Sequence, residues 1–291
     1  MARDVFDYDQ AFVRNLGLVS PQEQSRLRQI RVAIPGMGGV GGLHLLTLTR
    51  LGIAQFAIAD GDTFDLQNFN RQFGATVDTI GRPKVDVMAA MASSINPQAS
   101  IRIIPHPIDS ENVDQLLDNC TAVVDGLDFF ELDARRLVFH RARQRGLPVV
   151  TCAPLGFSVA LLTFLPNGPS FDEFFAIRDG MDRYDQLARF AVGLAPAAVH
   201  LPYLDRSKIS LTNRHGPSSI IAVDLCAALA ATEILNLVLK RRPPVAVPRY
   251  LQFDPYRLRL CTGRLRWGNR HPVQRLKLWW LRHQLRHLID S

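Results

Sequence analysis

Cysteines are few in this sequence, and no two of them lie close together along the chain. The four are Cys120, Cys152, Cys226 and Cys261, and no two of them form a C-x-x-C motif. Structural zinc sites usually draw two ligands from such a motif, so we expect no zinc. Scattered thiols in a cytosolic chain are typical of core or surface positions rather than of disulfides.

Long apolar runs are also lacking, and we expect no signal peptide. No run of about 18 or more apolar residues predicts a transmembrane helix. The first ten residues, MARDVFDYDQ, are too acidic and polar for a signal peptide. We therefore expect a cytoplasmic protein. Its 291 residues, 47% of them hydrophobic, suffice for a large core in one extended α/β domain or in one domain with appendages.

Acidic residues are scarce in the C-terminal part of the chain. Residues 240–291 hold 13 Lys/Arg but only 2 Asp/Glu, which gives this segment a net charge of +11. The whole chain has a net charge of +7, so the remaining residues together carry −4. The basic character is therefore a property of the C-terminal segment and not of the whole protein.

What the sequence does contain is a regular alternation of apolar runs and helical patterns. Short apolar runs predict strands at 31–34, 56–60, 101–105, 121–126, 148–154 and 159–166. Helical patterns lie between them, at 43–52, 83–95, 112–119 and 131–146. Such alternation predicts right-handed βαβ units, and hence an α/β fold with a doubly wound, Rossmann-like and mostly parallel sheet.

The flanking segments have other patterns. Residues 3–30 are expected to be helical, with Ser20 as the N-cap and Pro21 in the first turn of a helix. Residues 167–217 are rich in Gly, Pro, Asp and Arg, and such a long excursion is more often a lid or substrate loop than a linker. The remaining elements are a helix at 218–240, strands within 249–260 and a basic amphipathic helix at 276–289. They predict a C-terminal β/α extension of the sheet.

A glycine-rich loop follows the first predicted strand and opens a helix. Its glycines are Gly36, Gly38, Gly39 and Gly41 in the run GMGGVG. Glycines there permit a tight turn and a close approach of the backbone to phosphate, at a helix N-terminus with free N–H groups. Asp60 ends the next strand, where a carboxylate commonly takes ribose hydroxyls. This pattern suits NAD and ATP equally, and a tight turn without any ligand is the plain alternative.

Charged residues further along distinguish these two nucleotides. Arg71, Lys84 and Asp128 all follow strand ends, and an open α/β sheet binds its ligands at the carboxyl ends of its strands. Beyond what a dinucleotide needs, a triphosphate requires extra cations and a carboxylate for Mg²⁺. Arg71 and Lys84 can supply the cations, and Asp128 can supply the carboxylate. The run NFNRQ adds three amides that can donate hydrogen bonds to phosphate oxygens: Asn68, Asn70 and Gln72.

Each charged residue also has an ordinary structural alternative. Arg71 could pair with Asp62 or Asp65 on a solvated loop. Lys84 could be a surface residue in the first turn of its helix, and Asp128 could cap the helix predicted at 131. Because all of them occur in order behind one glycine loop, the combination favours the triphosphate.

In these motifs the sequence resembles the E1-like adenylating enzymes, that is the MoeB/ThiF/HesA group and the ubiquitin-activating enzymes. The matching runs are GMGGVGG, IADGD, NFNRQ, GRPK, INP and DGLD, which together cover roughly residues 31–165. The resemblance implies an ATP-dependent adenylyltransferase. In such an enzyme a substrate carboxylate attacks the α-phosphate of Mg·ATP, pyrophosphate leaves and an acyl-adenylate forms.

The resemblance also implies roles for individual residues. Asp60 would hold the ribose, and Gly39 and Gly41 would line the phosphate loop together with Gly36 and Gly38. The triphosphate would be bound by Asn68, Arg71, Gln72 and Lys84. Mg²⁺ would be held by Asp128. Members of the group are usually homodimers in which an arginine of one subunit reaches the ATP of the other, and Arg14 is the candidate here.

Three departures from the group narrow the expected chemistry. The paired cysteine zinc knuckles are absent and residues 167–217 hold no cysteine. We also expect no trailing rhodanese or ubiquitin-fold domain. An enzyme that only adenylates, or that uses the adenylate for dehydration or amide formation, therefore fits better than one that forms a thioester. Cys152 could be a nucleophile or a packing residue, whereas Cys226 lies in an alanine-rich helix and is expected to pack.

The expected substrate is the C-terminal carboxylate of a small carrier protein or peptide. Two alternatives stay open: an NAD-dependent oxidoreductase and a non-catalytic E1-like scaffold that binds nucleotide without turnover. The basic helix LKLWWLRHQLRHLID, with Trp279 and Trp280, could pack on the domain or on a dimer mate. It could also bind an acidic protein partner, an anionic membrane surface or a nucleic acid.

These expectations divide the chain into five segments. They are an N-terminal helical arm (1–30), an ATP-binding Rossmann-like core (31–166), a crossover or substrate loop (167–217), the remainder of the adenylation domain (218–262) and a basic amphipathic tail (263–291).

Overall fold

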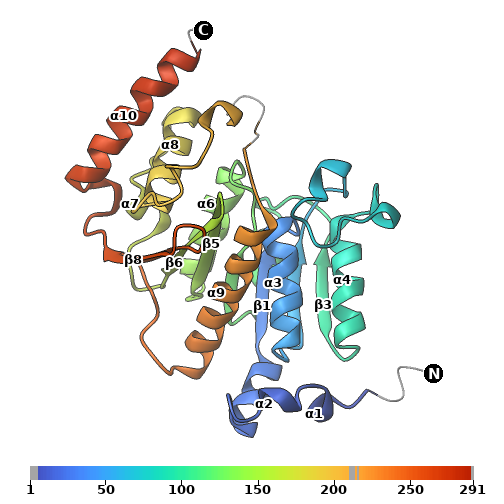
Figure 1. The fold of residues 1–291 in the computed structure, drawn as a ribbon. Helices are drawn as coiled ribbons and strands as arrows, with labels where there is room; N and C mark the ends of the chain where they lie inside the picture. Colours follow the sequence, from blue (N-terminus) through green and yellow to red (C-terminus); the bar gives the residue numbers. More distant parts are fainter. Residues whose placement is uncertain (1–5, 210–213, 215, 290–291) are drawn as a thin grey trace.

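A computed structural model describes residues 6–209, 214 and 216–289, with the side chains of 282–289 excepted. Eight strands of this part of the chain form one sheet in the order β3-β2-β1-β4-β5-β6-β7-β8 (Figure 1). The strands are β1 Arg31–Pro35, β2 Gln55–Ala59, β3 Ser100–Ile104, β4 Ala122–Asp125, β5 Val149–Leu155, β6 Ser158–Phe164, β7 Arg249–Asp254 and β8 Arg259–Arg264. From β3 to β5 the neighbours are parallel, and from β5 to β8 they are antiparallel. The predicted Rossmann-like sheet is confirmed, with an antiparallel β extension at one end.

Helices cover both faces of the sheet. One face packs against α3 Gly39–Arg50, α4 Lys84–Ile95 and α9 Ile220–Leu239, which lie in front of the sheet in Figure 1. The other face packs against α5 Val113–Leu117, α6 Leu132–Gln144, α7 Phe171–Phe175 and α8 Arg183–Leu194. Strand β1 shows the reason for this arrangement, because Val32 and Ile34 enter the first core while Ala33 enters the second. Side chains alternate along a strand, so a strand that is apolar throughout needs a covered face on both sides.

The N-terminal arm lies at the opposite end of the sheet from the phosphate loop, at the bottom of Figure 1. It holds α1 Tyr8–Ala11, the 3₁₀ helix η2 Val13–Asn15 and α2 Pro21–Gln29. Helix α2 begins with the predicted cap, since the Ser20 hydroxyl accepts from the Glu23 N–H. The Asn15 amide donates to the carbonyl oxygen of Leu51, just beyond the last residue of α3, at 3.2 Å. The arm is therefore fixed to the amino end of the parallel strands.

The segment 167–217 is more ordered than its composition indicates. Helices α7 and α8 occupy much of it, and Phe171, Phe175 and Phe190 are at most 5% exposed in the second core. The 3₁₀ helix η5 Arg206–Lys208 follows them. The first part of the segment is therefore a packed layer of the domain. Its role as a substrate loop stays a prediction.

Helix α9 is long and apolar enough to cross a membrane by length and composition, which the sequence analysis did not expect. It lies against α3, β5 and β6 in this structure, with Cys226 and Ile234 fully buried. Glu233 on the same helix is also fully buried and pairs with Arg242. These contacts are those of a core helix.

The C-terminal segment starts later than the predicted boundary at 263, because β8 continues to Arg264. The 3₁₀ helix η6 Gly268–Arg270 leads into α10 Pro272–Ile289, which lies along α8. Leu278 is 3% exposed and faces the domain, whereas Trp279 is 64% exposed. Most of the Trp279 side chain is therefore not covered by the domain, and packing of the tryptophans on a dimer mate stays a prediction.

Two further 3₁₀ helices, η3 Leu66–Asn68 and η4 Val77–Thr79, belong to the long loop between β2 and α4. This loop carries NFNRQ and is drawn in cyan at the upper right of Figure 1. It follows the carboxyl end of β2, so it lies at the same edge of the sheet as the glycine loop.

Candidate nucleotide-binding site

The glycine loop and the loop after β4 meet backbone to backbone. A Cβ on Gly36 would lie 2.3 Å from the carbonyl oxygen of Gly126, and a Cβ on Gly41 would lie 1.8 Å from the carbonyl oxygen of Gly36. Real Cβ atoms do not approach oxygen so closely, so both positions require glycine. Gly36 also has a φ of +88°, which favours glycine on its own account. Gly126, which the sequence analysis did not select, is the third member of this contact.

Helix α3 begins inside the glycine loop. The sequence predicted a helix from residue 43, but α3 starts at Gly39, because glycine's low helix propensity hides the first turn. The first turn of a helix presents N–H groups without intrahelical partners and the positive end of the helix dipole. Gly38, Gly39 and Gly41 therefore place a bare backbone where a phosphate group can approach.

Asp60 holds the glycine loop in place. Its Oδ2 accepts from the Met37 N–H at 2.6 Å, and its Oδ1 accepts from the Asp62 N–H at 2.8 Å. Burial raises the pKa of this carboxyl, and the two N–H donors partly offset that rise. Each carboxylate oxygen has a second lone pair, so Asp60 can still accept a hydrogen bond from a hydroxyl group. Its role at the ribose stays a prediction.

The NFNRQ run lies directly against the glycine loop. The Gln72 Nε2 atom is 3.8 Å from the position of a Cβ on Gly38, and the Arg71 carbonyl oxygen is 3.3 Å from that on Gly39. Gln72 is 7% exposed, and its Oε1 has no hydrogen-bond partner among the described residues. Because a side-chain amide can be rotated to exchange its oxygen and nitrogen, Gln72 can present a donor to a ligand here. The run therefore forms one wall of the loop.

The other polar residues of NFNRQ form hydrogen bonds that fix the conformation of this segment. The Asn68 Oδ1 accepts from the Asp65 N–H at 3.0 Å and closes the turn of η3. The Arg71 guanidinium donates from Nη1 to the Asn70 Oδ1 at 2.9 Å, and Asn70 donates to the Ser218 carbonyl oxygen at 2.9 Å. In the part of the chain that the structure describes, Arg71 forms no ion pair with Asp62 or Asp65.

Ser218 lies just before α9, so this contact joins NFNRQ to the N-terminus of that helix. A Cβ on Gly39 would lie 3.3 Å from the Cγ2 of Val223 in the first turn of α9. The Ser219 hydroxyl caps α9 and also donates to the Gly156 carbonyl oxygen at 2.8 Å. The glycine loop is thus enclosed by α3, NFNRQ and α9.

Lys84 forms an ion pair with Asp62 rather than lying free at the surface. Its Nζ is 2.9 Å from the Asp62 Oδ2, and its side chain is 8% exposed while that of Asp62 is 72% exposed. The surface alternative for Lys84 is therefore wrong. Asp62 also adjoins Asp60 in the loop after β2, so Lys84 lies at the edge where the glycine loop begins. An exposed partner is easily exchanged for a phosphate oxygen.

Asp128 lies in the loop that contacts Gly36, and it is exposed. Its Oδ1 accepts from the Phe130 N–H at 3.0 Å, so it closes a turn before α6 instead of capping that helix, whose N-cap is Glu131. Arg135 of α6 is buried and fixes this loop by donating hydrogen bonds to the carbonyl oxygens of Leu127 and Asp128. The sequence analysis missed Arg135, and no local pattern separates it from the other arginines of α6.

Arg214 approaches the same loop from the segment before α9. Its guanidinium pairs with Glu131 and lies 5.8 Å from the centre of the Phe130 ring. This residue therefore places part of the crossover segment beside Asp128.

An aromatic cluster borders this end of the sheet next to the β5–β6 turn. The rings of Phe157 and Tyr203 stack at 5.5 Å, and Tyr256, which is 68% exposed, lies 5.5 Å from Phe157. The Tyr203 hydroxyl donates to the buried Asp254 carboxylate at 2.9 Å and accepts from the Phe157 N–H. The sequence analysis did not select these residues, because they come from three distant segments.

The pattern of glycine loop, NFNRQ wall and Asp128 loop has counterparts among known proteins. A family model described as the ThiF family matches residues 12–275. The chain belongs to the ThiF family.

This ThiF-family chain is similar to several curated proteins over about half its length. It is 31% identical over 153 residues to the SAMP-activating enzyme E1 of Haloferax volcanii, which covers 53% of this chain and 56% of the relative. It is 33% identical over 146 residues to the tRNA threonylcarbamoyladenosine dehydratase of Bacillus subtilis, which covers 48% of this chain and 55% of the relative. The chain therefore spans little more than half the length of these relatives.

Solved structures match over a larger part of the fold. The crystal structure of E. coli MccB with ATP has a TM-score of 0.67 at 16% identity and covers 89% of this chain and 71% of its own. E. coli tRNA N6-threonylcarbamoyladenosine dehydratase with AMP has a TM-score of 0.59 at 17% identity, and covers 80% of this chain and 96% of its own. At such low identity these likenesses concern the fold alone.

Other predicted positions of this ThiF-family chain lie away from the loop. Arg14, in η2, is exposed at the amino end of the sheet, so it can reach a nucleotide only in another copy of the chain. Cys152 is 2% exposed within the first core, where burial raises the pKa of its thiol well above the usual value. This buried environment favours a packing role for Cys152 over a role as catalytic nucleophile.

Metal ligands are sparse in this family member. Among the described residues there is no group of three or more His, Cys, Asp or Glu side chains placed to hold a metal ion. Mg²⁺ commonly takes one or two carboxylates together with substrate phosphates and waters. The exposed carboxylate of Asp128 fits that kind of donor set once phosphates are present.

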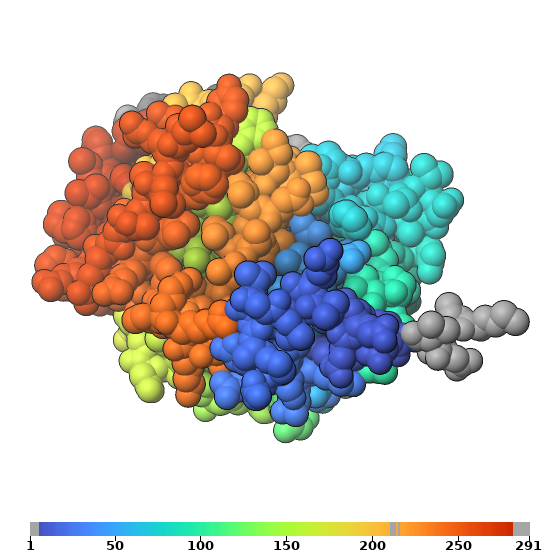
Figure 2. Space-filling view, turned by 60° about the horizontal axis from the view of Figure 1, so that its bottom comes forward, coloured from blue at the N-terminus to red at the C-terminus, as the bar shows by residue number. Residues whose placement is uncertain are grey.

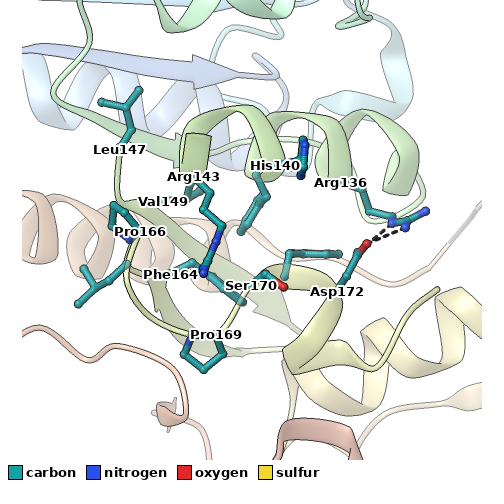
Figure 3. A pocket seen from close by; sticks show the side chains of 13 residues that line it. Arg136, His140, Arg143, Leu147, Val149, Phe164, Pro166, Pro169, Ser170 and Asp172 are labelled. Carbon is teal, nitrogen blue, oxygen red and sulfur yellow. Dashed lines mark hydrogen bonds and ion pairs between the residues drawn. The ribbon is translucent and has the colours of Figure 1, made fainter. Parts of the chain in front are cut away.

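The cavity in Figure 3 lies elsewhere. It has a volume of about 70 Å³ and lies between α6, α7 and the end of β6. Arg136 and Asp172, which form two hydrogen bonds of 2.8 and 2.6 Å, line the cavity together with Phe139 and Phe164. Its lining shares no residue with the glycine loop or NFNRQ, so it is separate from the nucleotide site.

Proposed function

We propose that this protein is an E1-like activating enzyme that adenylates a carboxylate with Mg·ATP and releases pyrophosphate. The observation that carries the proposal is the closure of NFNRQ onto the glycine loop, with Lys84 and Asp128 at the two sides. A dinucleotide does not require the two cationic side chains, Arg71 and Lys84, or the additional carboxylate of Asp128. Membership of the ThiF family supports the same conclusion.

The chain's own residues would bind and orient two anions that repel each other. The N–H groups at the start of α3 would bind phosphate oxygens, and Arg71 and Lys84 would neutralise charge on the departing pyrophosphate. Lys84 would exchange Asp62 for a phosphate oxygen in doing so. Asp128 would hold Mg²⁺, which supplies charge neutralisation on the phosphates. Holding the carboxylate in line with the α-phosphate would then lower the barrier through positioning.

The proposed substrate is the C-terminal carboxylate of a small carrier protein or a peptide. The similarity to a SAMP-activating enzyme E1 of H. volcanii and to E. coli MccB, which is known in complex with MccA, supports this class. The aromatic cluster of Phe157, Tyr203 and Tyr256 offers an apolar wall beside the site along which a peptide tail can lie. The name of the B. subtilis relative makes tRNA threonylcarbamoyladenosine the second substrate to test.

A homodimer is part of this proposal. Arg14 of one subunit would reach the nucleotide of the other, since its own glycine loop lies at the far end of α3. A cytoplasmic location, where ATP and reduced thiols are available, remains a prediction from the sequence.

ATP–pyrophosphate exchange with candidate carboxylates tests the proposal. We expect Arg71→Ala and Asp128→Ala each to lower the exchange rate by about 100-fold or more, as loss of a group that stabilises developing charge does. Arg50→Ala and Asp78→Ala, which change exposed residues outside the site, are the matched controls. Exchange that persists in both site variants would refute the residue assignment.

The two alternatives predict different results in the same set of measurements. An NAD-dependent oxidoreductase would be stabilised against heat by NAD in preference to Mg·ATP. A non-catalytic scaffold would bind Mg·ATP but show no exchange with any carboxylate. Preferential stabilisation by Mg·ATP together with exchange would exclude both.

A further inference from the structure

The tryptophans of this chain are gathered on one surface. All three occur between residues 267 and 280, and Trp267, Trp279 and Trp280 are 68%, 64% and 40% exposed. Large aromatic side chains usually contribute their area to a core or an interface. Since the core of this protein contains no tryptophan, this concentration indicates an interface.

Two aliphatic side chains extend the same surface along α10. Val273 and Leu276 are 52% and 65% exposed and lie one turn apart on the helix, with Leu276 about one turn before Trp279 and Trp280. The opposite side of α10 is engaged with the domain, through buried Leu278 and through Gln274, which donates to the Val192 carbonyl oxygen at 2.9 Å. The helix is thus held in place from behind while an apolar face points outward.

The surroundings of this face are predominantly basic. Between Asp254 and Asp290 the chain has no acidic residue but nine Lys or Arg residues. Arg275 is exposed on α10 itself, and the Arg206 guanidinium lies 4.8 Å from the centre of the Trp280 ring. A second copy of the chain would bring the same positive charge to this face, so self-association through it is disfavoured.

A depression adjoins the start of the helix. It has a volume of about 680 Å³ and is lined by Trp267, Arg143, Arg266 and Arg270, with Glu173 as the single acidic residue in its lining. The Ser170 N–H and neighbouring arginines lower the pKa of that carboxyl. Arginine guanidinium groups are the side chains best suited to phosphate, because they donate several hydrogen bonds in a fixed plane.

From these observations we propose that the surface formed by η6 and the outer face of α10 docks on an anionic lipid membrane. Trp279, Trp280, Val273 and Leu276 enter the headgroup region, where tryptophan is favoured and aliphatic side chains gain from leaving water. The surrounding arginines lie over lipid phosphates. A nucleic acid would use the arginines but gain nothing from the aliphatic residues.

Docking there would leave the nucleotide site open. In Figure 1 α10 is at the upper left and the NFNRQ loop at the upper right, and Figure 2 shows the same two regions on opposite flanks. Membrane binding is therefore compatible with adenylation but does not depend on it. The two proposals can fail separately.

Tryptophan fluorescence measures this surface directly, because the chain has no tryptophan elsewhere. We expect vesicles of phosphatidylcholine and phosphatidylglycerol in equal parts to shift the emission maximum to shorter wavelength and to sediment the protein. Vesicles of phosphatidylcholine alone should do neither, and raising the salt concentration should release the protein.

The double variant Leu276→Ser/Trp279→Ser should weaken sedimentation by about 10-fold or more, given the share of the buried apolar area that it removes. Leu18→Ser, which changes a leucine that is 76% exposed on the N-terminal arm, is the control. Circular dichroism establishes that each variant is folded. Absence of sedimentation with the anionic vesicles, or equal sedimentation of the double variant, would overturn the proposal. So would an emission shift with single-stranded RNA or an acidic peptide but not with vesicles.

Discussion

Arg135 and Asp125 form a buried ion pair beneath the loop that carries Asp128. The Arg135 Nε lies 2.9 Å from the Asp125 Oδ2, and the two side chains are 4% and 2% exposed. The same carboxylate accepts from the Thr151 hydroxyl at 3.1 Å and from the Leu127 N–H at 3.2 Å. The proposed metal ligand at the surface is thus positioned by a charge pair that is itself buried.

We expect Arg135→Ala to destabilise the protein by about 3–5 kcal/mol, because it leaves the Asp125 carboxylate buried without a countercharge. Arg136→Ala is the matched control on the same helix. Its partners Asp172 and Asp179 are 41% and 94% exposed, so its loss should cost about 1 kcal/mol or less. Urea denaturation of the two variants measures the difference, and equal destabilisation would contradict this account of the pair.

The glycine loop gives a prediction about backbone contact. In Gly41→Ala the new Cβ would lie 1.8 Å from the Gly36 carbonyl oxygen, so the loop must open and the contact with Gly126 must be lost. We expect no stabilisation of this variant by Mg·ATP in a thermal unfolding experiment, and a lower melting temperature without nucleotide. Gly216→Ala, where a Cβ has no neighbour within 4 Å, should behave as the natural protein. A Gly41→Ala variant that still responds to Mg·ATP would show that the loop does not bind phosphate.

Local rules explain why most of the sheet could be predicted from the sequence. The apolar run 31–34 must be a strand covered on both faces, and Ser20-Pro21 followed by Glu23 marks a helix start whatever surrounds it. The glycine loop and NFNRQ were recognisable by their order along the chain. That they lie against each other depends on the parallel pairing of β1 with β2, which the alternation of strands and helices implied.

Long-range contacts explain what the sequence did not predict. In the run VVDGLD, Asp125 was expected in a strand and Asp128 just after it, but the sequence does not show that Arg135 of the next helix pairs with Asp125 and holds the loop of Asp128. Helices α7 and α8 were hidden in a segment rich in Gly and Pro, because their phenylalanines gain stability only from packing on the far face of the sheet. The exposure of Trp279 depends in the same way on which side of α10 meets α8.

The ion pair between Lys84 and Asp62 gives a prediction with opposite signs for its two members. If Lys84 binds phosphate, Lys84→Gln should weaken Mg·ATP binding by about 10-fold or more, which corresponds to the loss of one charged hydrogen bond. Asp62→Asn removes a competing anion and should strengthen binding by a few-fold. Titration calorimetry with a non-hydrolysable ATP analogue measures both. Weaker binding in both variants would instead indicate that the intact pair shapes the site.

Cys152 gives a prediction that separates packing from catalysis. Burial holds the pKa of its thiol well above the usual value, so the thiolate required of a nucleophile is disfavoured. We expect Cys152→Ala to keep both the ATP–pyrophosphate exchange rate and the rate of product formation from the acyl-adenylate within about threefold, while losing about 1–2 kcal/mol of stability through the cavity it leaves. Complete loss of product formation in a folded Cys152→Ala variant would restore the nucleophile hypothesis.

The buried side chain of His44 should make the free energy of unfolding depend on pH. It is fully buried in α3, neither ring nitrogen has a hydrogen-bond partner among the described residues, and burial lowers its pKa to about 3. An unfolded histidine takes up its proton near pH 6.5, so between pH 6.5 and 3 the unfolded state binds the extra proton. The contribution of His44 to the free energy of unfolding is therefore fully present above pH 6.5. It falls by about 1.4 kcal/mol for each pH unit below that value.

The variant His44→Leu has no group to protonate at this position. Its loss of unfolding free energy between pH 6.5 and pH 5 should be smaller than that of the natural protein by about 2 kcal/mol, measured by urea denaturation at both pH values. His106→Leu, which changes an exposed histidine, is the control and should leave that loss unchanged. If His44→Leu and the natural protein lose the same stability on acidification, the ring of His44 must be hydrated or hydrogen-bonded in solution, and its burial cannot be the source of acid sensitivity.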